Sequence, residues 1–186
     1  MVGLFLANGF EEVEALAPLD MLRRAGVEVT TFGVGAKTIT GAHGIAVEAD
    51  AVLEPSVLEH LNGVILPGGM PGTKNLDADS LVCKAVTDCY QKGELVAAIC
   101  AAPSVLGRLG VLNGKSFTCF PGFEDACIGG RLAEAGVVMD QNVITAKGAG
   151  CALWFGAALV AFYKGDDVAN TLLQEMQGNY EGYSRV

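Results

Sequence analysis

The chain has 186 residues, of which 51% are hydrophobic and 18% charged, and its formal net charge is -9. This length and composition suit one compact domain over residues 1–186 with a sizeable core, and they argue against disorder. Nucleic acids and anionic membrane surfaces attract basic proteins, so the acidic balance argues against both as partners.

The first strand indicated by the sequence is Val2 to Ala7, a short apolar run with no basic stretch before it, which does not resemble an export signal. The richest apolar segment, Cys151 to Tyr163, is too short to span a membrane. Six cysteines without an export signal indicate the reducing cytoplasm, where thiols stay free. No Cys-x-x-Cys pair is present and neither histidine lies near a cysteine in sequence, so we expect no metal site.

Strand and helix patterns alternate along the chain. After the first strand, Glu11 to Ala25 indicates a helix that stops at Gly26, and Val27 to Val34 indicates a second strand, which together make a βαβ unit. The remaining predicted strands are a hairpin over Thr38 to Val47, Val64 to Pro67, Leu95 to Ile99, Ser116 to Phe120 and Val143 to Ala146. The remaining predicted helices are Pro55 to Leu61, Asp79 to Lys92, Pro103 to Leu109, Ala149 to Tyr163 and Asp167 to Gln177.

Short apolar strands separated by helices predict a flavodoxin-like three-layer α/β sandwich with a mostly parallel sheet. In such sheets, ligands bind beyond the carboxyl ends of the strands. We therefore expect three loops to meet there: Asn8 to Glu14, Pro67 to Gly72, and Cys100 to Pro103.

Cys100 ends an apolar run and is followed at once by two alanines and a proline, which is the pattern of a nucleophile elbow. A helix starting at Pro103 would place the thiol near a helix N-terminus, where the dipole favours the thiolate. The alternative is an inert cysteine buried as a small hydrophobic residue.

Acidic residues follow the first strand. Glu11 and Glu12 are typical of a first helical turn, and Glu11 has the capping-box spacing from Asn8. Glu14 lies one turn further in. A carboxyl group buried in a crevice has a raised pKa and can donate a hydrogen bond to a thiolate, so Glu14 is a candidate acid or base for Cys100.

The glycine pair Gly68-Gly69 permits a tight turn that exposes backbone N–H groups toward the expected crevice. With the amide of Ala101, these groups would form an oxyanion hole. Glycine pairs are also common in ordinary turns, and that alternative stays open.

Five segments in order resemble the ThiJ/PfpI superfamily, in the branch of the Parkinsonism-associated deglycase. The segments are Phe10-Glu11-Glu12-Val13-Glu14, Asp20 to Gly26, Leu66-Pro67-Gly68-Gly69, Ala98 to Pro103, and Gly148-Ala149-Gly150. The resemblance implies a flavodoxin-like homodimer with a nucleophilic, easily oxidised Cys100 and a protonated Glu14 bonded to it. It also implies that Gly69 and Ala101 supply backbone amides. Gly68, beside them, is a candidate substrate-binding residue.

The chain departs from its relatives at three positions. Ala101 stands where the protease-like branch has a histidine, so we expect no peptidase activity. Phe120 stands where many members have another histidine. His43 lies near the position of an arginine in several relatives; it is a candidate substrate-binding residue when protonated, the alternative being a solvated turn residue.

These residues favour a cofactor-independent cysteine enzyme acting on reactive dicarbonyls or glycated adducts, a glutathione-independent glyoxalase or a deglycase. The alternative is a redox-sensing or chaperone-like stress protein that works through oxidation of Cys100 with little turnover. A glutamine amidotransferase ranks below both, because no histidine follows Cys100 in the chain.

Overall fold

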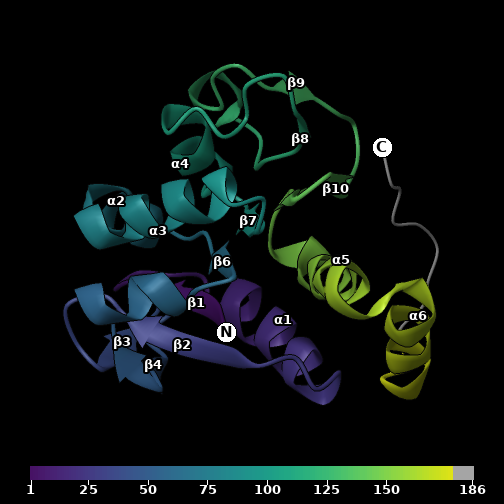
Figure 1. Cartoon of the computed structure of the whole chain (residues 1–186), viewed down its shortest axis with the longest axis horizontal. Helices are drawn as coiled ribbons and strands as arrows, with labels where there is room; N and C mark the ends of the chain where they lie inside the picture. The colour runs from purple at the N-terminus through teal and green to yellow at the C-terminus, as the bar shows by residue number, and fades with distance from the viewer. Residues whose placement is uncertain (178–186) are drawn as a thin grey trace.

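A seven-stranded sheet runs through the middle of the molecule (Figure 1). The computed structural model describes residues 1–177 of the chain. The strand order across the sheet is β10 (Val137–Asp140), β11 (Val143–Ala146), β7 (Leu95–Ile99), β6 (Gly63–Leu66), β1 (Val2–Leu6), β2 (Val29–Gly33) and β5 (Ala51–Val52). Neighbouring strands run parallel except β10 and β11, which run antiparallel. The predicted α/β class with a mostly parallel sheet is confirmed.

Helices cover both faces of this sheet. One face carries α1 (Glu12–Arg24), α5 (Ala152–Lys164) and α6 (Asp166–Glu175), and the other carries α2 (Gly72–Ala78), α3 (Ser80–Gln91) and α4 (Pro103–Arg108). None of the helices in residues 1–177 has the length and apolar character needed to cross a membrane.

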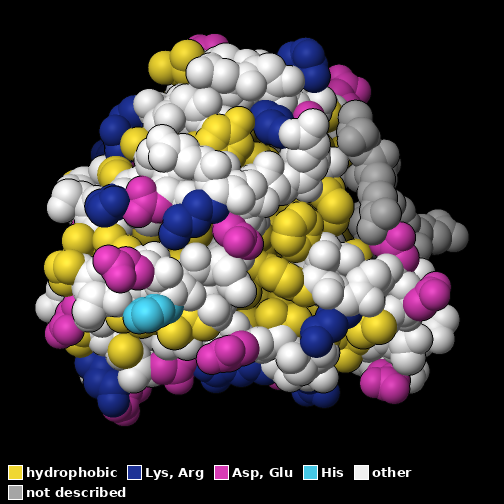
Figure 2. All heavy atoms as spheres, in the orientation of Figure 1, with side chains coloured by type: hydrophobic (Ala, Val, Ile, Leu, Met, Phe, Trp, Pro, Cys, Tyr) yellow, Lys and Arg dark blue, Asp and Glu magenta, His cyan; other side chains and the backbone are white. Residues whose placement is uncertain are grey.

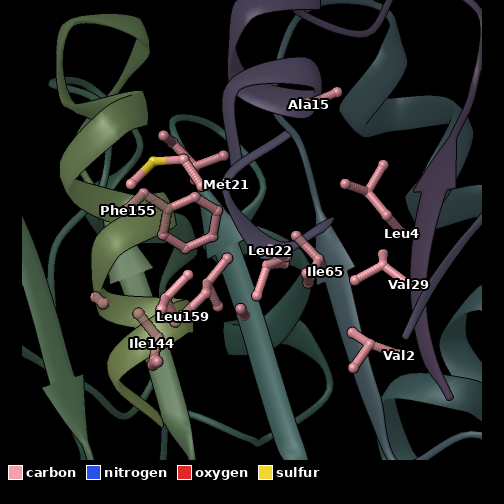
Figure 3. Packing of buried hydrophobic residues seen from close by; sticks show 14 of the residues in the cluster. Val2, Leu4, Ala15, Met21, Leu22, Val29, Ile65, Ile144, Phe155 and Leu159 are labelled. Carbon is pink, nitrogen blue, oxygen red and sulfur yellow. The ribbon is translucent and has the colours of Figure 1, made fainter. Parts of the chain in front are cut away.

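Two hydrophobic clusters follow from strand periodicity, since alternate residues of a buried strand point to opposite faces. Leu4 and Leu6 of β1 pack in the cluster beneath α1 and α5, whereas Phe5 packs in the cluster beneath α3 and α4. Figure 3 shows the first cluster, where Met21 of α1 lies beside Phe155 of α5.

A close approach of α1 and α5 depends on Gly156. A β-carbon at this position would lie 2.5 Å from Met21 Sδ and 3.1 Å from Pro18 Cα. A larger residue would therefore push α1 away from α5. Because α1 carries Glu14, this shift would also displace Glu14 in the site described below.

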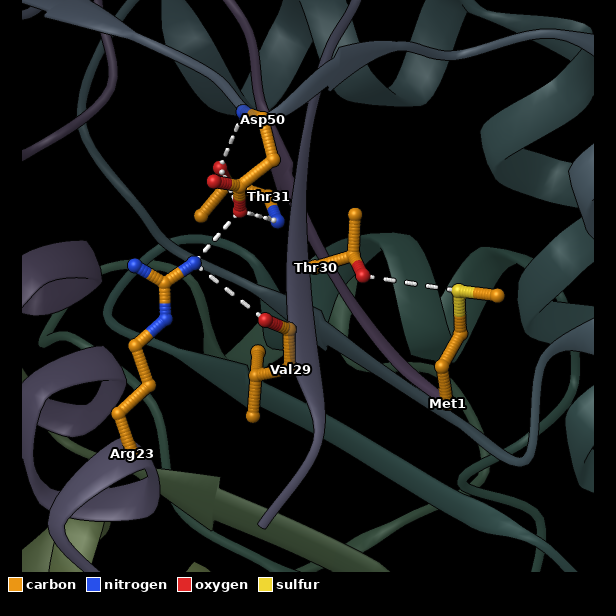
Figure 4. Close-up of polar contacts among 6 residues, drawn as sticks. All are labelled: Met1, Arg23, Val29, Thr30, Thr31 and Asp50. Atoms are coloured by element: carbon orange, nitrogen blue, oxygen red, sulfur yellow. Dashed lines mark hydrogen bonds and ion pairs between the residues drawn. The ribbon is translucent and has the colours of Figure 1, made fainter. Parts of the chain in front are cut away.

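The far end of α1 is joined to β2 by Asp50 (Figure 4). Asp50 Oδ2 accepts hydrogen bonds from Arg23 at 2.6 Å and from the backbone N–H and hydroxyl of Thr31, both at 2.8 Å. Burial opposes ionisation of Asp50, but the bonds from Thr31 and the charge of Arg23 prevail and lower its pKa. These contacts fix the orientation of α1 on the sheet.

Two small sheets lie outside the main one. The predicted hairpin is confirmed as β3 (Thr38–Thr40) and β4 (Ala46–Glu48), paired antiparallel. The predicted strand Ser116 to Phe120 is only β8 (Ser116–Phe117), which pairs with β9 (Arg131–Leu132) in a separate two-stranded sheet. Short 3-10 helices are η1 (Pro55–His60), η2 (Glu124–Ala126) and η3 (Ala149–Cys151).

The sequence patterns missed β5, β9, β10 and α2. The turn after β10 is made by Gln141 at φ 58°, a conformation for which glycine or asparagine is the usual signal. Helix α2 follows Pro71 directly and is only seven residues long, so its periodicity is too short to distinguish it from a loop.

Candidate active site

Three loops meet at the carboxyl ends of β1, β6 and β7, as the sequence predicted. Strand β1 pairs with β2 on one side and β6 on the other, so the order of the chain across the sheet reverses there. The Glu11 N–H donates to the Gly68 carbonyl at 3.0 Å, and the Gly72 N–H donates to the Gly9 carbonyl at 3.0 Å. This is the type of switch point at which open α/β sheets bind ligands.

Cys100 occupies the turn that follows β7. Its φ is 66°, a left-handed conformation that costs a non-glycine residue about 1–3 kcal/mol. Hydrogen bonds hold the turn on both sides: the Cys100 N–H donates to Ala146 at 2.9 Å, and its carbonyl accepts from Phe120 N–H at 2.8 Å. The half-buried side chain is followed by two buried alanines, which is the geometry of a nucleophile elbow.

Glu14 lies fully buried in α1, facing this turn. Its Oε2 accepts a hydrogen bond from Gly68 N–H at 2.9 Å, and its carboxylate accepts one from the Cys100 thiol. Its Oε1 has no nitrogen or oxygen partner among residues 1–177. A buried carboxyl group left partly unpaired favours its neutral form.

Close contacts leave no room for a side chain at Gly68 or Gly69. A β-carbon on Gly68 would lie 2.6 Å from both Cys100 Cβ and Glu14 Oε2. Gly69 has φ +86°, and a β-carbon there would lie 2.4 Å from the Glu11 backbone nitrogen. The backbone N–H groups of Gly69 and Ala101 both donate toward the Cys100 sulfur, which favours its thiolate form.

Burial raises the pKa of both Glu14 and Cys100. It raises the pKa of Glu14 from 4.5 to about 7, although hydrogen bonds from Cys100 and Gly68 oppose the shift. Burial, together with the neighbouring Glu14 carboxylate, raises the pKa of Cys100 to about 12, against the Gly69 and Ala101 amides. The expected lowering of the thiol pKa by a helix dipole is thus contradicted, because burial outweighs it and α4 is only six residues long.

Above pH 7, the pair therefore holds one proton between sulfur and carboxyl oxygen. With the proton on Cys100, Glu14 is a base; with the proton on Glu14, Cys100 is a thiolate that faces two amide donors. The two arrangements differ only by a proton transfer along an existing hydrogen bond.

His43 is bonded to Glu12. Its backbone N–H donates to Glu12 Oε1 at 2.8 Å, and its Nδ1 lies 2.9 Å from Glu12 Oε2. The bond to Glu12 and the charges of Glu11 and Glu12 raise the pKa of His43. Its side chain is 66% exposed, and these contacts connect it to α1 rather than to Cys100.

The first turn of α1 differs from the sequence interpretation. Glu11 is the N-cap residue and makes no side-chain cap, while Asn8 Oδ1 accepts from Thr40 N–H at 2.9 Å, so the predicted capping box is wrong. Glu12 is buried and binds the hairpin loop instead of only complementing the helix dipole. No local sequence pattern indicates this contact, because the partner lies 31 residues away.

A group of side chains with metal-ligand chemistry occurs beside the first loop. Donor atoms of Glu11, Glu12 and His43 lie within 4.8 Å of one another. Both Glu12 oxygens already accept hydrogen bonds from His43, which explains the clustering without an ion.

Comparison with known proteins identifies the family of this chain. The model of the DJ-1/PfpI family matches residues 1–162. A Parkinson disease protein 7 homolog of Danio rerio is 35% identical over 174 residues, covering 89% of this chain and 90% of that protein. A protein of Pyrococcus horikoshii named as a deglycase is 33% identical over 147 residues, covering 77% of this chain and 88% of that one.

A solved structure of Toxoplasma gondii DJ-1, described as oxidized, superposes with a TM-score of 0.91 at 27% identity and covers 96% of this chain and 98% of its own. The α/β architecture, the sequence identity and the family match all agree. The chain therefore belongs to the DJ-1/PfpI family, which includes deglycases.

Proposed function

We propose that this protein is a cofactor-independent cysteine enzyme acting on reactive dicarbonyls or glycated adducts, as a glutathione-independent glyoxalase or a deglycase. The observation that carries the proposal is the hydrogen-bonded pair of Cys100 and buried Glu14, with the Gly69 and Ala101 amides directed at the sulfur. Membership in a family that includes a deglycase supports the same chemistry.

The first step forms a bond between Cys100 sulfur and the aldehyde carbon of the substrate. The pair starts either as a thiol with a carboxylate or as a thiolate with a carboxylic acid. In both cases the shared proton is on Glu14 once the carbon–sulfur bond has formed. Negative charge moves to the carbonyl oxygen, where the amides of Gly69 and Ala101 stabilise it. Glu14 then returns the proton to that oxygen and gives a hemithioacetal.

The second step is a proton transfer between adjacent carbons. Glu14 carries the proton of the former aldehyde carbon to the neighbouring carbonyl oxygen, which gives an enediol. It then carries the hydroxyl proton of the sulfur-bearing carbon to the neighbouring carbon, so that a lactoyl thioester forms. Water then cleaves the thioester and releases lactate and the free thiol. One cysteine and one carboxyl group suffice, so this reaction needs no cofactor.

The proposal extends to substrate binding, assembly and cellular location. His43 and Gly68 contribute to binding a small substrate, and a second copy of the chain forms a homodimer. Because Ala101 offers no imidazole, the proposal excludes peptide cleavage. Six free cysteines favour a reducing compartment, the cytoplasm.

The test follows conversion of methylglyoxal to lactate by NMR. Cys100→Ser and Glu14→Gln are each expected to reduce the rate by about 100-fold or more, because each removes a group that acts in the reaction. Cys83→Ser is the control, since serine can keep the hydrogen bond to the Asp77 carbonyl and lies away from the site. Rates unchanged in either site variant contradict the proposal.

A second candidate is a redox sensor based on Cys100. The half-exposed sulfur faces two amide donors, and a relative with the same fold has been solved in an oxidized form. Peptide mass spectrometry after graded peroxide separates the candidates. Selective sulfinate at Cys100 with negligible dicarbonyl turnover favours the sensor, whereas equal oxidation of all six cysteines contradicts it.

A further inference from the structure

An apolar cavity borders the turn that holds Cys100. Its volume is about 350 Å³, and two segments of the chain line it. One segment is Phe120 and Pro121, which follow β8, and the other is Lys147 to Cys151, which follows β11. Apart from Lys147, the lining residues described by the structure carry apolar side chains or none.

Both lining segments are tied to Cys100 by backbone hydrogen bonds. The Cys100 N–H donates to the carbonyl of Ala146, the residue before Lys147, at 2.9 Å. The Phe120 N–H donates to the Cys100 carbonyl at 2.8 Å. Strand β11 runs parallel to β7, with Ala146 opposite Ile99, so the cavity lies at the carboxyl ends of these strands, where α/β sheets bind ligands.

Phe120 forms an aromatic wall of this cavity. It is 47% exposed, whereas the preceding residue, Cys119, is buried. A β-carbon on Gly148 would lie 3.2 Å from Cδ2 of the Phe120 ring and 3.8 Å from its Cε2. Glycine therefore lets the ring lie close to the backbone at position 148. The exposed part of the ring is free to pack against an aromatic group of a ligand.

The cavity has room for such a group. A β-carbon on Gly150, another lining residue, would meet no atom of residues 1–177 within 4 Å. An apolar cavity of about 150 Å³ is large enough to bind benzene, so the larger cavity beside Phe120 accommodates a phenyl ring. The methyl group of methylglyoxal would leave most of this apolar surface in contact with water.

We propose that Phe120 and this cavity bind the substituent of the dicarbonyl substrate and make arylglyoxals better substrates than methylglyoxal. The subsite rests on the proposed function for its substrate: the aldehyde carbon bonds to Cys100 sulfur, and the aryl group on the neighbouring carbonyl lies against Phe120. The steps are those given above for methylglyoxal. Phenylglyoxal and one water molecule therefore give mandelate, and the thiol of Cys100 is regenerated.

The test compares alkylation of Cys100 by phenacyl chloride and by chloroacetone. In both reactions a carbon–sulfur bond forms as the carbon–chlorine bond breaks and chloride leaves, and the reagents differ only in phenyl against methyl. Trypsin places Cys100 and Cys151 in separate peptides, residues 93–108 and 148–164, so mass spectrometry measures each rate. The same two rates for glutathione correct for the intrinsic reactivity of the reagents.

The corrected ratio of phenacyl to chloroacetone rates at Cys100 should be about 10 in the wild type, because the phenyl ring is buried against Phe120. In Phe120→Ala it should fall close to 1, and in Phe120→Leu, which keeps an apolar wall, it should lie between. Ile128→Ala is the matched control, since Ile128 is 62% exposed and lies outside the described lining; its ratio should equal that of the wild type.

A wild-type ratio near 1 overturns the subsite, as does a preference for phenacyl chloride at Cys151 alone. An unchanged ratio in Phe120→Ala overturns the role of Phe120. A change of sedimentation in Phe120→Ala would show that a second copy of the chain covers the cavity, which also overturns the subsite.

Alkylation needs no turnover, so the two proposals fail separately. A high phenacyl ratio without conversion of methylglyoxal or phenylglyoxal supports the aryl-binding subsite and contradicts the proposed enzyme. Turnover of both dicarbonyls with a ratio near 1 does the reverse. If both proposals hold, kcat/KM for phenylglyoxal exceeds that for methylglyoxal, and Phe120→Ala reduces this preference.

Discussion

At the scale of single residues, the chemistry of the site depends on burial, which raises the pKa of Glu14 and of Cys100 and so favours the protonated form of each. Water cannot solvate Glu14, so its carboxyl group keeps a proton to a pH where exposed glutamates are ionised. The same burial would leave Cys100 an inert thiol if it stood alone. Together, the two groups share a proton, and a thiolate becomes accessible near neutral pH.

This sharing predicts how the alkylation rate of Cys100 depends on pH. Below about pH 7, both groups are protonated and the thiolate is absent; as pH rises through about 7, one proton leaves and the rate with iodoacetamide increases. In Glu14→Gln, the step near pH 7 should vanish, since glutamine takes no proton and burial then holds the thiol pKa above its usual 9.0.

The matched control for that experiment is Glu11→Gln. The Glu11 charge raises the pKa of Glu14, so removing this charge should move the step to lower pH without abolishing it. Mass spectrometry of the alkylated Cys100 peptide measures the rate at each pH. An identical pH profile in wild type and Glu14→Gln would contradict the shared proton.

Gly68→Ala tests how tightly the pair must be packed. The added methyl group would lie 2.6 Å from Cys100 Cβ and from Glu14 Oε2, so one of them must move. Displacements of this kind cost about 100-fold in rate, and we expect methylglyoxal turnover to fall by that order. Thermal melting followed by circular dichroism should show a folded protein; a folded variant with wild-type turnover would refute the packing requirement.

At the scale of elements, Glu12 joins α1 to the β3–β4 hairpin. Burial alone would raise its pKa, but hydrogen bonds from the His43 side chain and from the backbone of His43 and Ile45 lower it to about 2. The folded state therefore prefers the ionised Glu12. Its contribution to stability is full above pH 4.5 and is lost as the pH falls toward 2.

The ionisation of Glu14 changes the stability of the fold in the opposite direction with pH. Its pKa in the folded state is raised to about 7, so the stability due to its protonated form is present below pH 4.5 and is lost as the pH rises through 7. The two glutamates lie in one helix and are separated by a single residue, yet their pH dependences oppose each other.

Urea unfolding at several pH values separates these effects. Glu12→Gln should lower the free energy of unfolding by about 1–3 kcal/mol at pH 7, with a smaller loss near pH 3. Glu14→Gln should instead remove the decrease in stability between pH 4.5 and 7. Equal losses at both pH values in Glu12→Gln would show that its ionisation does not stabilise the fold.

At the scale of the whole molecule, hydrophobic side chains remain at the surface. Val13 of α1 is 45% exposed and Leu153 of α5 is 44% exposed, on two helices that pack together. Figure 2 shows a band of hydrophobic side chains over the region that α5 occupies in Figure 1. Burial of such a surface favours association with a second copy of the chain.

Analytical ultracentrifugation tests the homodimer. The protein should sediment with twice the mass of one chain, and Val13→Glu should shift it toward the monomer because the interface would have to bury a charge. Ile128→Glu is the control, since this side chain is 62% exposed and follows η2, remote in sequence from both helices. A monomer at micromolar concentration would refute the dimer.

The sequence by itself determined the α/β class, most strands and helices, and the residues that form the candidate site. These features follow from local patterns: apolar runs define buried strands, and Cys100 with its two alanines marks a turn. Helix α2 is too short for its periodicity to show, and β10 was missed because the turn after it is made by Gln141 rather than by glycine or asparagine.

Only the tertiary structure decided the electrostatics and the distant pairings. The Glu12–His43 bond spans 31 residues, so no local pattern in the sequence indicates it. The pKa of Cys100 likewise moved opposite to the expected direction. The physical reason is that a pKa depends on burial and on neighbouring charges in space, which the fold sets and which spacing along the chain does not contain.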